Sequence, residues 1–411
     1  MKAVVIGSGL GGLLAGAELS KEGYEVEIFE RLPFIGGRFT NLEYKGFKLS
    51  TGALHMIPHG SRGPLAHMLS NVGARVTIVD SKPMAMVNMR DKNISFEDFR
   101  KLLSLSHRMK FAFLTFASRI FKPNISFKEW VVRYFDDDLI LRFADSFCGW
   151  ALSLRSEDIQ AKEMLEIIHN IIRYGGPGIP IGGCGAVTKA LVQVINSNGG
   201  KLYTRSQVDK IIINKGCAVG ISVKGRIINA DLVISNIGHS ETSRMYHCTD
   251  KQYMQKISNI IPSKGIKICL ASDKPLIGHS GVVFTPFADR INGINEVTNA
   301  DSSLAPSKKH LVMSHQTLVS DDLKHEIYLG LRDLKKLFPD GFKVLLIQCY
   351  HNGWPVNKAR SGSDIGNTTP IRNLYVVGDD AKGKGGIEVE GIALGVRNMM
   401  KKIDKEELSS S

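Results

Sequence analysis

Three glycines and one glutamate near the N-terminus have the types and the spacing to do chemistry. Gly7, Gly9 and Gly12 follow the pattern GxGxxG, and Glu30 comes one predicted helix and one predicted strand later. In this pattern the first glycine permits a tight turn, the second lets a pyrophosphate approach the backbone, and the third lets a helix pack on a strand. A carboxylate at the position of Glu30 can accept hydrogen bonds from ribose hydroxyls. Together these residues predict a site for an adenine dinucleotide.

The local sequence supplies the elements that must position this site. β-Forming residues cover 3–6, a helical stretch runs from 10 to about 22, and a second strand covers 25–29. Gly23 stands where the helix needs a C-terminal cap. The unpaired N–H groups and the positive dipole end of the helix would face the phosphates. The rest of the loop should therefore contact the ligand as well, through Ser8, Leu10 and Gly11.

The bulk properties are typical of a soluble globular protein and exclude several classes. A chain of 411 residues favours two domains. It has no run of about 20 apolar residues, and its first strand begins too early to leave room for a cleavable signal peptide. The six cysteines are scattered rather than paired, which predicts a reducing compartment and no metal site. We therefore expect a cytoplasmic protein.

The net charge of +13 is the unusual bulk property. It indicates a basic surface, which could attract anionic lipid or nucleic acid. No helix-turn-helix, zinc-finger or RNA-binding motif accompanies the charge, so we expect no nucleic-acid partner. The tract 102–122, predicted as one helix, alternates aromatic residues with cations. It predicts either a packing face or a surface for peripheral association with a membrane.

The pattern along the chain predicts an α/β protein with a discontinuous nucleotide-binding domain. Residues 94–175 have a helical pattern, whereas 207–235 have the alternation and turns of antiparallel hairpins. A strand at 374–377 ends in Gly378-Asp379, and a helix follows from about 390 to 402. We expect residues 1–80, 181–240 and 361–405 to bind the dinucleotide, residues 81–180 and 241–360 to form an α+β substrate domain, and residues 406–411 to form a flexible tail.

These motifs resemble those of the FAD-dependent amine oxidase superfamily, and within it the phytoene desaturase and protoporphyrinogen oxidase-like oxidoreductases. The resemblance rests on the glycine loop with Glu30-Arg31, on Gly36-Gly37-Arg38, on Val208 and on Gly378-Asp379. It spans the whole chain and implies FAD as cofactor. The fold that it implies is a discontinuous Rossmann-type FAD-binding domain with a second, α+β substrate-binding domain. A simple NAD dehydrogenase would not need the Gly-Asp ligand far along the chain.

The resemblance implies further cofactor contacts. The segment after Glu30 would lie beside the phosphates and the flavin, the central hairpin would hold the adenine, and the C-terminal segment would hold the ribitol, pyrophosphate and pyrimidine. A helix N-terminus under the pyrimidine would also stabilise the negative charge of a reduced flavin. In chain order these residues are Arg31, Gly37, Arg38, Val208, Gly378, Asp379, Val389, Gly391 and Ile392.

Catalytic residues are less clearly marked. His55 follows the Gly37-Arg38 segment and is a candidate for a polar group near the flavin, or else a structural histidine. Glu388 and Glu390 stand where phytoene desaturases carry proline and small residues, so they either take part in catalysis or cap a helix and face solvent. Lys267 lies on an apolar strand, where alternation predicts one wet face.

The predicted activity is transfer of hydride between a hydrophobic organic substrate, isoprenoid- or carotenoid-like, and flavin N5. The alternative is a non-catalytic carrier of prenyl lipids with the same fold, although a carrier would not require the intact cofactor residues. No second nucleotide motif for NAD(P)H is present. The electron acceptor therefore stays open among oxygen, a quinone and another carrier.

Overall fold

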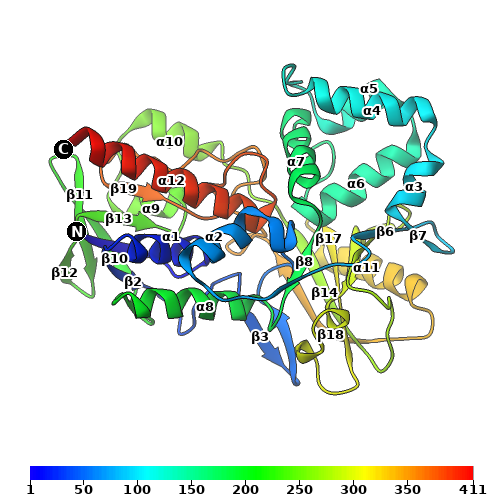
Figure 1. The fold of residues 1–411 in the computed structure, drawn as a ribbon, viewed down its shortest axis with the longest axis horizontal. Helices are drawn as coiled ribbons and strands as arrows, with labels where there is room; N and C mark the ends of the chain where they lie inside the picture. The colour runs from blue at the N-terminus through cyan, green and yellow to red at the C-terminus, as the bar shows by residue number, and fades with distance from the viewer. Residues whose placement is uncertain (411) are drawn as a thin grey trace.

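Two sheets organise the chain (Figure 1), and the computed structural model describes residues 1–410, with side chains as far as Glu406. The first sheet has the order β19-β13-β1-β2-β9, and every pairing in it is parallel. This is the predicted Rossmann-type arrangement, and it confirms the α/β class. Its strands are β1 (Lys2–Ile6), β2 (Glu25–Phe29), β9 (Lys201–Tyr203), β13 (Leu232–Ser235) and β19 (Leu374–Val376).

The central strand β1 is apolar from Ala3 to Ile6 because it is covered on both faces. Ala3 and Val5 belong to a core shared with the helices, whereas Val4 and Ile6 belong to a core shared with a small three-stranded sheet. This division follows the two-residue period of a strand. The covering elements are α1 (Leu10–Lys21), α8 (Cys184–Ser197) and α12 (Glu388–Ser410) on one face, and β10 (Val208–Asn214), β11 (Cys217–Val223) and β12 (Arg226–Asn229) on the other.

The C-terminal helix α12 lies against the N-terminal helix α1, so the two ends of the chain build one layer (Figure 1). It begins at Glu388 and continues to Ser410. Most of the segment 406–411, expected to be a flexible tail, is therefore helical backbone, and Ser411 lies outside the described residues.

The second sheet has seven strands in the order β18-β14-β17-β16-β15-β6-β7. Its pairings are antiparallel except for β15 with β6. Helix α11 (Leu323–Leu337) covers one face and contributes Leu334 to the core there. The strands are β6 (Ala85–Asn88), β7 (Asn93–Ser95), β14 (Gly265–Ser272), β15 (Val282–Phe284), β16 (Gly293–Glu296), β17 (His310–Thr317) and β18 (Lys343–Tyr350).

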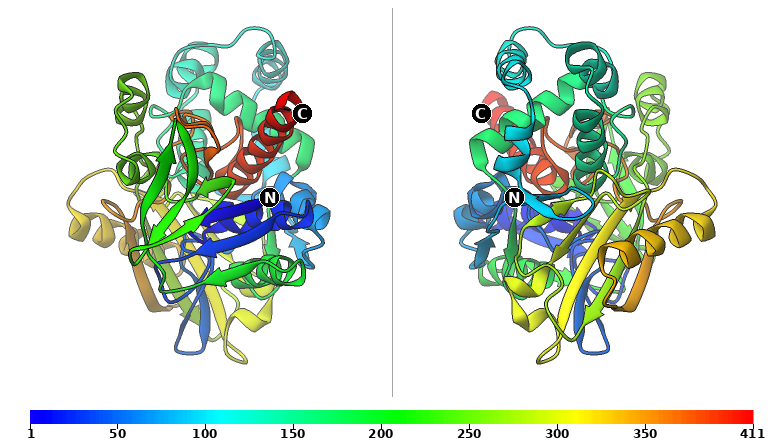
Figure 2. Two further views of the ribbon diagram at one scale, coloured as in Figure 1. Left: turned by 90° about the vertical axis from the view of Figure 1, so that its left-hand side faces the viewer. Right: turned by 90° about the vertical axis from the view of Figure 1, so that its right-hand side faces the viewer.

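Helices fill the predicted segment 94–175, and Figure 2 shows them above the strands of the second sheet. The expected single helix at 102–122 is wrong, because Leu103 is extended and the Ser104 side chain caps a new helix by accepting from His107 N–H. No helix in the described part of the chain is both long and apolar enough to cross a membrane. The helices are α3 (Phe96–Leu102), α4 (Leu105–Ala117), α5 (Phe127–Phe135), α6 (Asp138–Leu152) and α7 (Ala161–Tyr174).

The sheets follow much of the expected domain division, which we retain as a proposal. The helical insert and the strands of 265–350 form one part, as expected, but helices α9 and α10 lie beside the first sheet (Figure 1). The remaining elements are shorter. They are β3 (Asn41–Tyr44), β4 (Phe47–Ser50), α2 (Pro64–Val72), β5 (Ile78–Asp80), β8 (Gly178–Pro180), α9 (His239–Met245) and α10 (Lys251–Ser258).

The side chain of Lys267 is fully buried. The alternation along this strand had predicted that one of its faces would be exposed to solvent. Strand β14 is buried along its whole length between β17 and β18. The Lys267 ammonium donates to Ser50 O (2.6 Å), Ser50 Oγ (2.9 Å) and Gly52 O (2.6 Å). A buried lysine is stable only when its donors are paired. This contact therefore ties the second sheet to the end of β4 and to Gly52 just beyond it.

We expect Lys267→Met to lower the free energy of unfolding by about 2–3 kcal/mol, because buried carbonyl oxygens lose a charged donor. Urea denaturation measures the change. Lys274→Met is the matched control: Lys274 pairs with Asp340 on the surface, and its loss should cost less than about 1 kcal/mol. Equal stability of the two variants would contradict the anchoring role.

Candidate cofactor and active site

The glycine loop connects β1 to α1 at the carboxyl end of the first sheet. Gly7 has φ +91°, which favours glycine. A Cβ on Gly12 would lie 2.2 Å from Gly7 O, so the third glycine of the pattern lets the helix start close to the strand. Gly9 precedes the helix without a side-chain cap. The N–H groups of the first turn are thus available to a phosphate.

Asn236 is a residue of this loop region that the sequence analysis missed. It follows β13 directly, and its amide lies against Gly9, Gly11 and Gly378. Oriented to satisfy both neighbours, the amide accepts from Gly9 N–H (3.1 Å) and donates to Val377 O (3.2 Å). A polar residue at the carboxyl end of a buried parallel strand was the available signal.

Glu30 ends β2 and lies in the wall of the cavity that the loop borders. Its carboxylate accepts from Ser8 N–H (2.8 Å), Ser8 Oγ (2.8 Å) and Leu32 N–H (2.9 Å). Ser8 is fully buried, so it positions Glu30 rather than facing the cavity. Arg31 and Val208 line the same region.

A buried charge cluster forms the next section of the wall. Arg38 donates to the carboxylate of Asp379 (2.7 Å) and also to Pro355 O (2.6 Å) and Val356 O (2.8 Å). The backbone N–H of Lys358 donates to the same Asp379 oxygen (2.5 Å). Burial alone would raise the pKa of Asp379, but the cations Arg38, Lys358 and Lys382 lower it to about 2. Asp379 is therefore ionised at any physiological pH.

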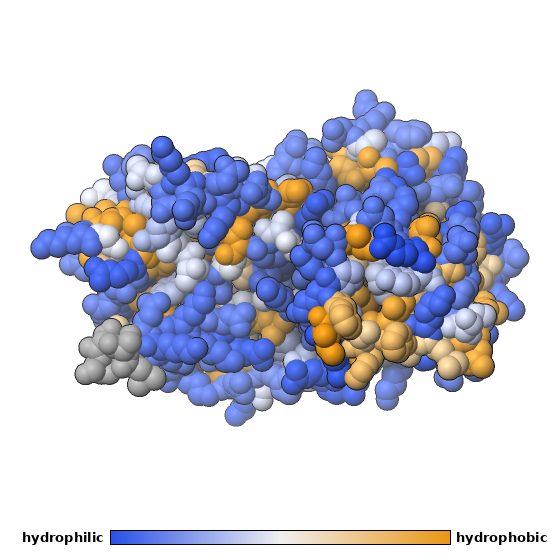
Figure 3. Space-filling view, turned by 90° about the horizontal axis from the view of Figure 1, so that it is seen from above, coloured by the Kyte–Doolittle hydropathy of each residue, from blue (hydrophilic) through white to orange (hydrophobic). Residues whose placement is uncertain are grey.

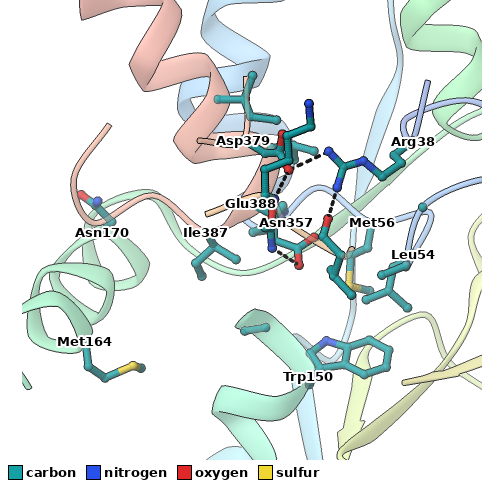
Figure 4. A pocket seen from close by; sticks show the side chains of 18 of the residues that line it. Arg38, Leu54, Met56, Trp150, Met164, Asn170, Asn357, Asp379, Ile387 and Glu388 are labelled. Atoms are coloured by element: carbon teal, nitrogen blue, oxygen red, sulfur yellow. Dashed lines mark hydrogen bonds and ion pairs between the residues drawn. The ribbon is translucent and has the colours of Figure 1, made fainter. Parts of the chain in front are cut away.

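Glu388 projects into the cavity where this cluster ends. Asn357 donates to its carboxylate (3.5 Å), and Figure 4 shows the two side chains between the Arg38–Asp379 pair and Trp150. Its backbone has φ +41°, which is strained for a residue with a side chain. Burial raises the pKa of Glu388 to about 7, against the opposing effects of Asn357 and nearby cations.

Glu390 has a different role, although it lies only two residues after Glu388. Its carboxylate accepts from Leu65 N–H (2.7 Å) and His59 N–H (3.2 Å), and so caps the N-terminus of α2. It is fully buried and does not line the cavity. Burial raises its pKa to about 7, against the hydrogen bonds from Leu65 and His59. The structure therefore gives no support to Glu390 as a catalytic group.

His55 also lies outside the cavity walls. It is fully buried, its Nε2 pairs with Lys48 O (2.8 Å), and its Nδ1 accepts from Cys184 N–H (3.2 Å). Burial lowers its pKa to about 3, so the ring stays neutral. The expected contact with flavin is corrected to a structural role, because both ring nitrogens are used within the protein.

The cavity has a volume of about 1970 Å³. A typical ligand pocket measures roughly 300–1,000 Å³, so this one has room for a dinucleotide and a second large molecule. The expected cofactor residues in its wall are Gly7, Gly9, Leu10, Gly11, Glu30, Arg31, Gly37, Arg38, Val208, Gly378, Asp379, Val389 and Ile392. Those outside the wall are Ser8, Gly12, His55 and Gly391.

Beyond Glu388 the cavity wall becomes apolar. Trp150, Met56 and Ile387 lie near Glu388 (Figure 4). Further along, phenylalanines from α3, α6 and β15 pack ring against ring, with centroids 4.8 Å apart for Phe99 and Phe143. The members of this aromatic wall are Phe96, Phe99, Phe143, Phe147 and Phe284. Such a wall can bind a long apolar molecule and exclude water from it.

The polar half of the cavity fits FAD. A Cβ placed on Gly37 would meet only Gly9 Cα, at 3.8 Å, so the two glycines face a shared open space. The uncapped helix start, the Glu30 carboxylate and the Arg38–Asp379 pair border that space. These are donors for a pyrophosphate and acceptors for ribose and ribitol hydroxyls, as a flavin dinucleotide requires.

Comparison with known proteins places the chain among flavoenzymes. The sequence profile of the flavin-containing amine oxidoreductases matches residues 10–392. An oxidoreductase from Methanosarcina mazei has a crystal structure that is 53% identical, covers 98% of this chain and all of that chain, and superposes with a TM-score of 0.93. An uncharacterized protein of Methanocaldococcus jannaschii is 46% identical over 98% of this chain and its own full length.

More distant relatives have assigned activities. Prolycopene isomerase 2 of an Oncidium hybrid is 25% identical, over 94% of this chain and 81% of its own. The neurosporene-forming phytoene desaturase of Cereibacter sphaeroides is 24% identical, over 59% of this chain and 54% of its own. Putrescine oxidase, at 15% identity, covers 98% of this chain and 99% of that chain with a TM-score of 0.73, which shows a shared fold.

We expect Gly9→Val to give colourless protein. Its side chain would occupy the shared space above the loop and would collide with Asn236, whose amide group lies 2.6 Å from the Cβ position. The flavin absorbance per mole of purified protein measures the loss. Gly216→Ala, in the open β10–β11 turn with φ +76°, introduces backbone strain away from the cavity and should stay yellow. A Gly9→Val protein with full flavin occupancy would contradict the site.

Glu30→Ala should weaken FAD retention by roughly 1.5–3 kcal/mol, because a charged hydrogen-bond acceptor is lost. A fluorescence titration of the apoprotein with FAD gives the dissociation constant. Glu27→Ala on the same strand serves as the control, since Glu27 pairs with Lys2 away from the cavity. Unchanged affinity in Glu30→Ala would exclude the ribose contact.

Proposed function

Because the chain belongs to the family of flavin-containing amine oxidoreductases, we propose that it moves hydride between a long apolar organic molecule and its flavin. The family makes the protein an FAD-dependent oxidoreductase. The proposal concerns the substrate class, which we take to be isoprenoid- or carotenoid-like.

The observation that carries this proposal is the continuity of the cavity. The glycine loop, Glu388 and the aromatic wall border one space of about 1970 Å³, so a molecule against the phenylalanines would reach the flavin without crossing water. The relatives named as carotenoid enzymes support the same substrate class. A molecule of this kind dissolves in lipid rather than water, which extends the proposal to peripheral association with a membrane.

Bound FAD supplies a two-electron acceptor at N5. In a desaturation the substrate loses a hydride from one carbon and a proton from its neighbour, and a carbon–carbon double bond forms. The chain's own task is to bind the apolar skeleton, exclude water and take the proton. Glu388 is placed for that task, because it lies where the polar and apolar halves of the cavity meet. Asn357 holds one of its carboxylate oxygens, which orients the group.

Isomerisation of a double bond is a second candidate, favoured by the prolycopene isomerases, whose match extends over most of this chain. The two reactions differ in their products. Desaturation removes two hydrogen atoms from the substrate and would transfer two electrons to bound flavin, whereas isomerisation keeps the mass of the substrate and would cause no net change in the redox state of the flavin. A carrier role does not require the intact Glu30 and Asp379, and the family assignment favours an enzyme.

The test is anaerobic mixing of the FAD-loaded protein with phytoene or prolycopene in detergent micelles. Bleaching of the flavin with a product lighter by two hydrogen atoms supports desaturation, and a rearranged product of equal mass supports isomerisation. Mass spectrometry of lipid extracted from the purified protein identifies the natural skeleton. Bleaching by polar amines, with no response to any apolar polyene, would overturn the substrate class.

We expect flavin reduction by an active substrate to accelerate as pH rises through about 7, the pKa of Glu388, because only the ionised carboxylate accepts a proton. Glu388→Gln should lower the rate by about 10²–10⁴-fold and abolish this pH dependence. Stopped-flow absorbance measures both.

Glu390→Gln provides a matched control, since Glu390 has a similarly raised pKa but caps α2. It should lower the melting temperature and leave the pH profile in place. A pH profile that follows Glu390 rather than Glu388 would reverse our assignment of the two carboxyl groups.

A further inference from the structure

Helix α4 (Leu105–Ala117) carries a stripe of large apolar side chains on its outer face. The stripe continues into the turn that follows the helix, and its members are spaced by four, four, three and four residues. All are exposed: Leu105 64%, Met109 65%, Phe113 68%, Phe116 66% and Ile120 76%. This spacing places side chains on one face of a helix.

The apolar stripe of α4 faces solvent, whereas the apolar stripe of an ordinary surface helix faces the core. Helix α11 buries Leu329 and Leu334 in the core against the second sheet, as amphipathic helices normally do. In α4 only Thr115 is buried. Single exposed apolar residues are normal, but a contiguous stripe marks an interaction surface. Figure 3 shows the molecule from above, the side on which α4 lies in Figure 1. In the right half of that view, apolar residues lie together among hydrophilic ones.

The segment that carries the stripe contains cations and no carboxylates. Residues 99–128 contain seven Lys or Arg and no Asp or Glu. Arg100, Lys101, Lys110, Arg119 and Lys122 are exposed, whereas Arg108 is partly buried and lines the cavity. Within the described residues, Arg100 and Arg119 form no ion pair with a carboxylate. The neighbouring elements supply a few acids, such as Glu166, which pairs with Lys122. Cations beside exposed aromatic groups are the pattern of a helix that lies on an anionic lipid surface.

The inner face of the same helix forms the cavity wall. Arg108, Phe111, Thr115 and Arg119 line the cavity at spacings of three, four and four residues. Phe116 lies at the edge between the two faces, because it lines the cavity and is also exposed. Only the thickness of one helix therefore separates the outer stripe from the apolar end of the cavity.

We propose that the outer face of α4, with the turn through Phe121, docks on the surface of a bilayer that contains anionic lipid, and that the apolar substrate enters the cavity beside α4 directly from that bilayer. The apolar stripe inserts among the acyl chains, and the cations contact the headgroups. The route of entry rests on the proposed function, whereas the docking itself does not.

The test is flotation of the full-length, FAD-loaded protein with vesicles of phosphatidylcholine alone or mixed equally with phosphatidylglycerol. We expect binding to the mixed vesicles at low salt and release at high salt. Met109→Gln with Phe113→Gln should weaken binding about tenfold or more, because neither residue lines the cavity and both are lost from the inserting stripe. Lys101→Glu with Lys110→Glu should remove the preference for anionic vesicles.

Val319→Gln with Tyr328→Gln is the matched control, because it removes two exposed apolar side chains near and on α11. It should bind like the wild type. Failure of the wild type to bind mixed vesicles at low salt would overturn the docking. So would a wild-type dimer that the Met109/Phe113 variant converts to a monomer, since a second copy would then cover the stripe.

The same variants separate the docking from the proposed function. With substrate in detergent micelles, Met109→Gln/Phe113→Gln should reduce its flavin as fast as the wild type, and with substrate in mixed vesicles it should be about tenfold slower. An equal rate from vesicles would overturn entry from the bilayer. Inactivity of the wild type with apolar substrates in micelles would instead overturn the proposed function and leave the flotation result to decide the docking.

Discussion

The pair formed by Arg38 and Asp379 is the interaction on which the architecture of the site depends. It joins two segments from opposite ends of the chain, and Arg38 also holds the carbonyls of Pro355 and Val356. Both charges are largely buried, so neither can lose its partner without a high desolvation cost. The pair thereby fixes three separate backbone segments around one cavity, and the segment that leads to Glu388 starts from this fixed point.

Two glutamates in the first turn of α12 show how placement decides chemistry. Glu388 and Glu390 have the same functional group and similarly raised pKa values. Yet Glu390 is bound to the N-terminus of another helix, whereas Glu388 meets the cavity and has a single amide partner. A carboxyl group whose oxygens accept hydrogen bonds from the protein backbone stabilises the fold. A carboxyl group with few hydrogen-bond partners in an apolar cavity is available for proton transfer. The strained backbone of Glu388 supports the second role.

The two halves of the cavity also belong to different parts of the fold. The polar half comes from the first sheet and its loops. The apolar half comes mainly from the helices between Phe96 and Tyr174. Helix α4 belongs to this part, with one face toward the cavity and the other toward the outside.

The sequence by itself determined the nucleotide-binding half of the protein. The order strand, glycines, helix, strand and Glu30 is local, and each step has a steric or electrostatic reason that operates within a few residues. The fold class and the adenine dinucleotide followed from such patterns, and the resemblance to the amine oxidase superfamily added FAD and the role of Gly378-Asp379. What only the tertiary structure decided depends on contacts between distant segments. The Asn236 side chain hydrogen-bonds to the glycine loop, and the Lys267 ammonium is buried against Ser50. The His55 ring pairs with Lys48 and Cys184 and does not line the cavity. Periodicity identified an apolar tract at 102–122, but whether that apolar face lies inside or outside depends on what packs against it, and no local pattern contains that information.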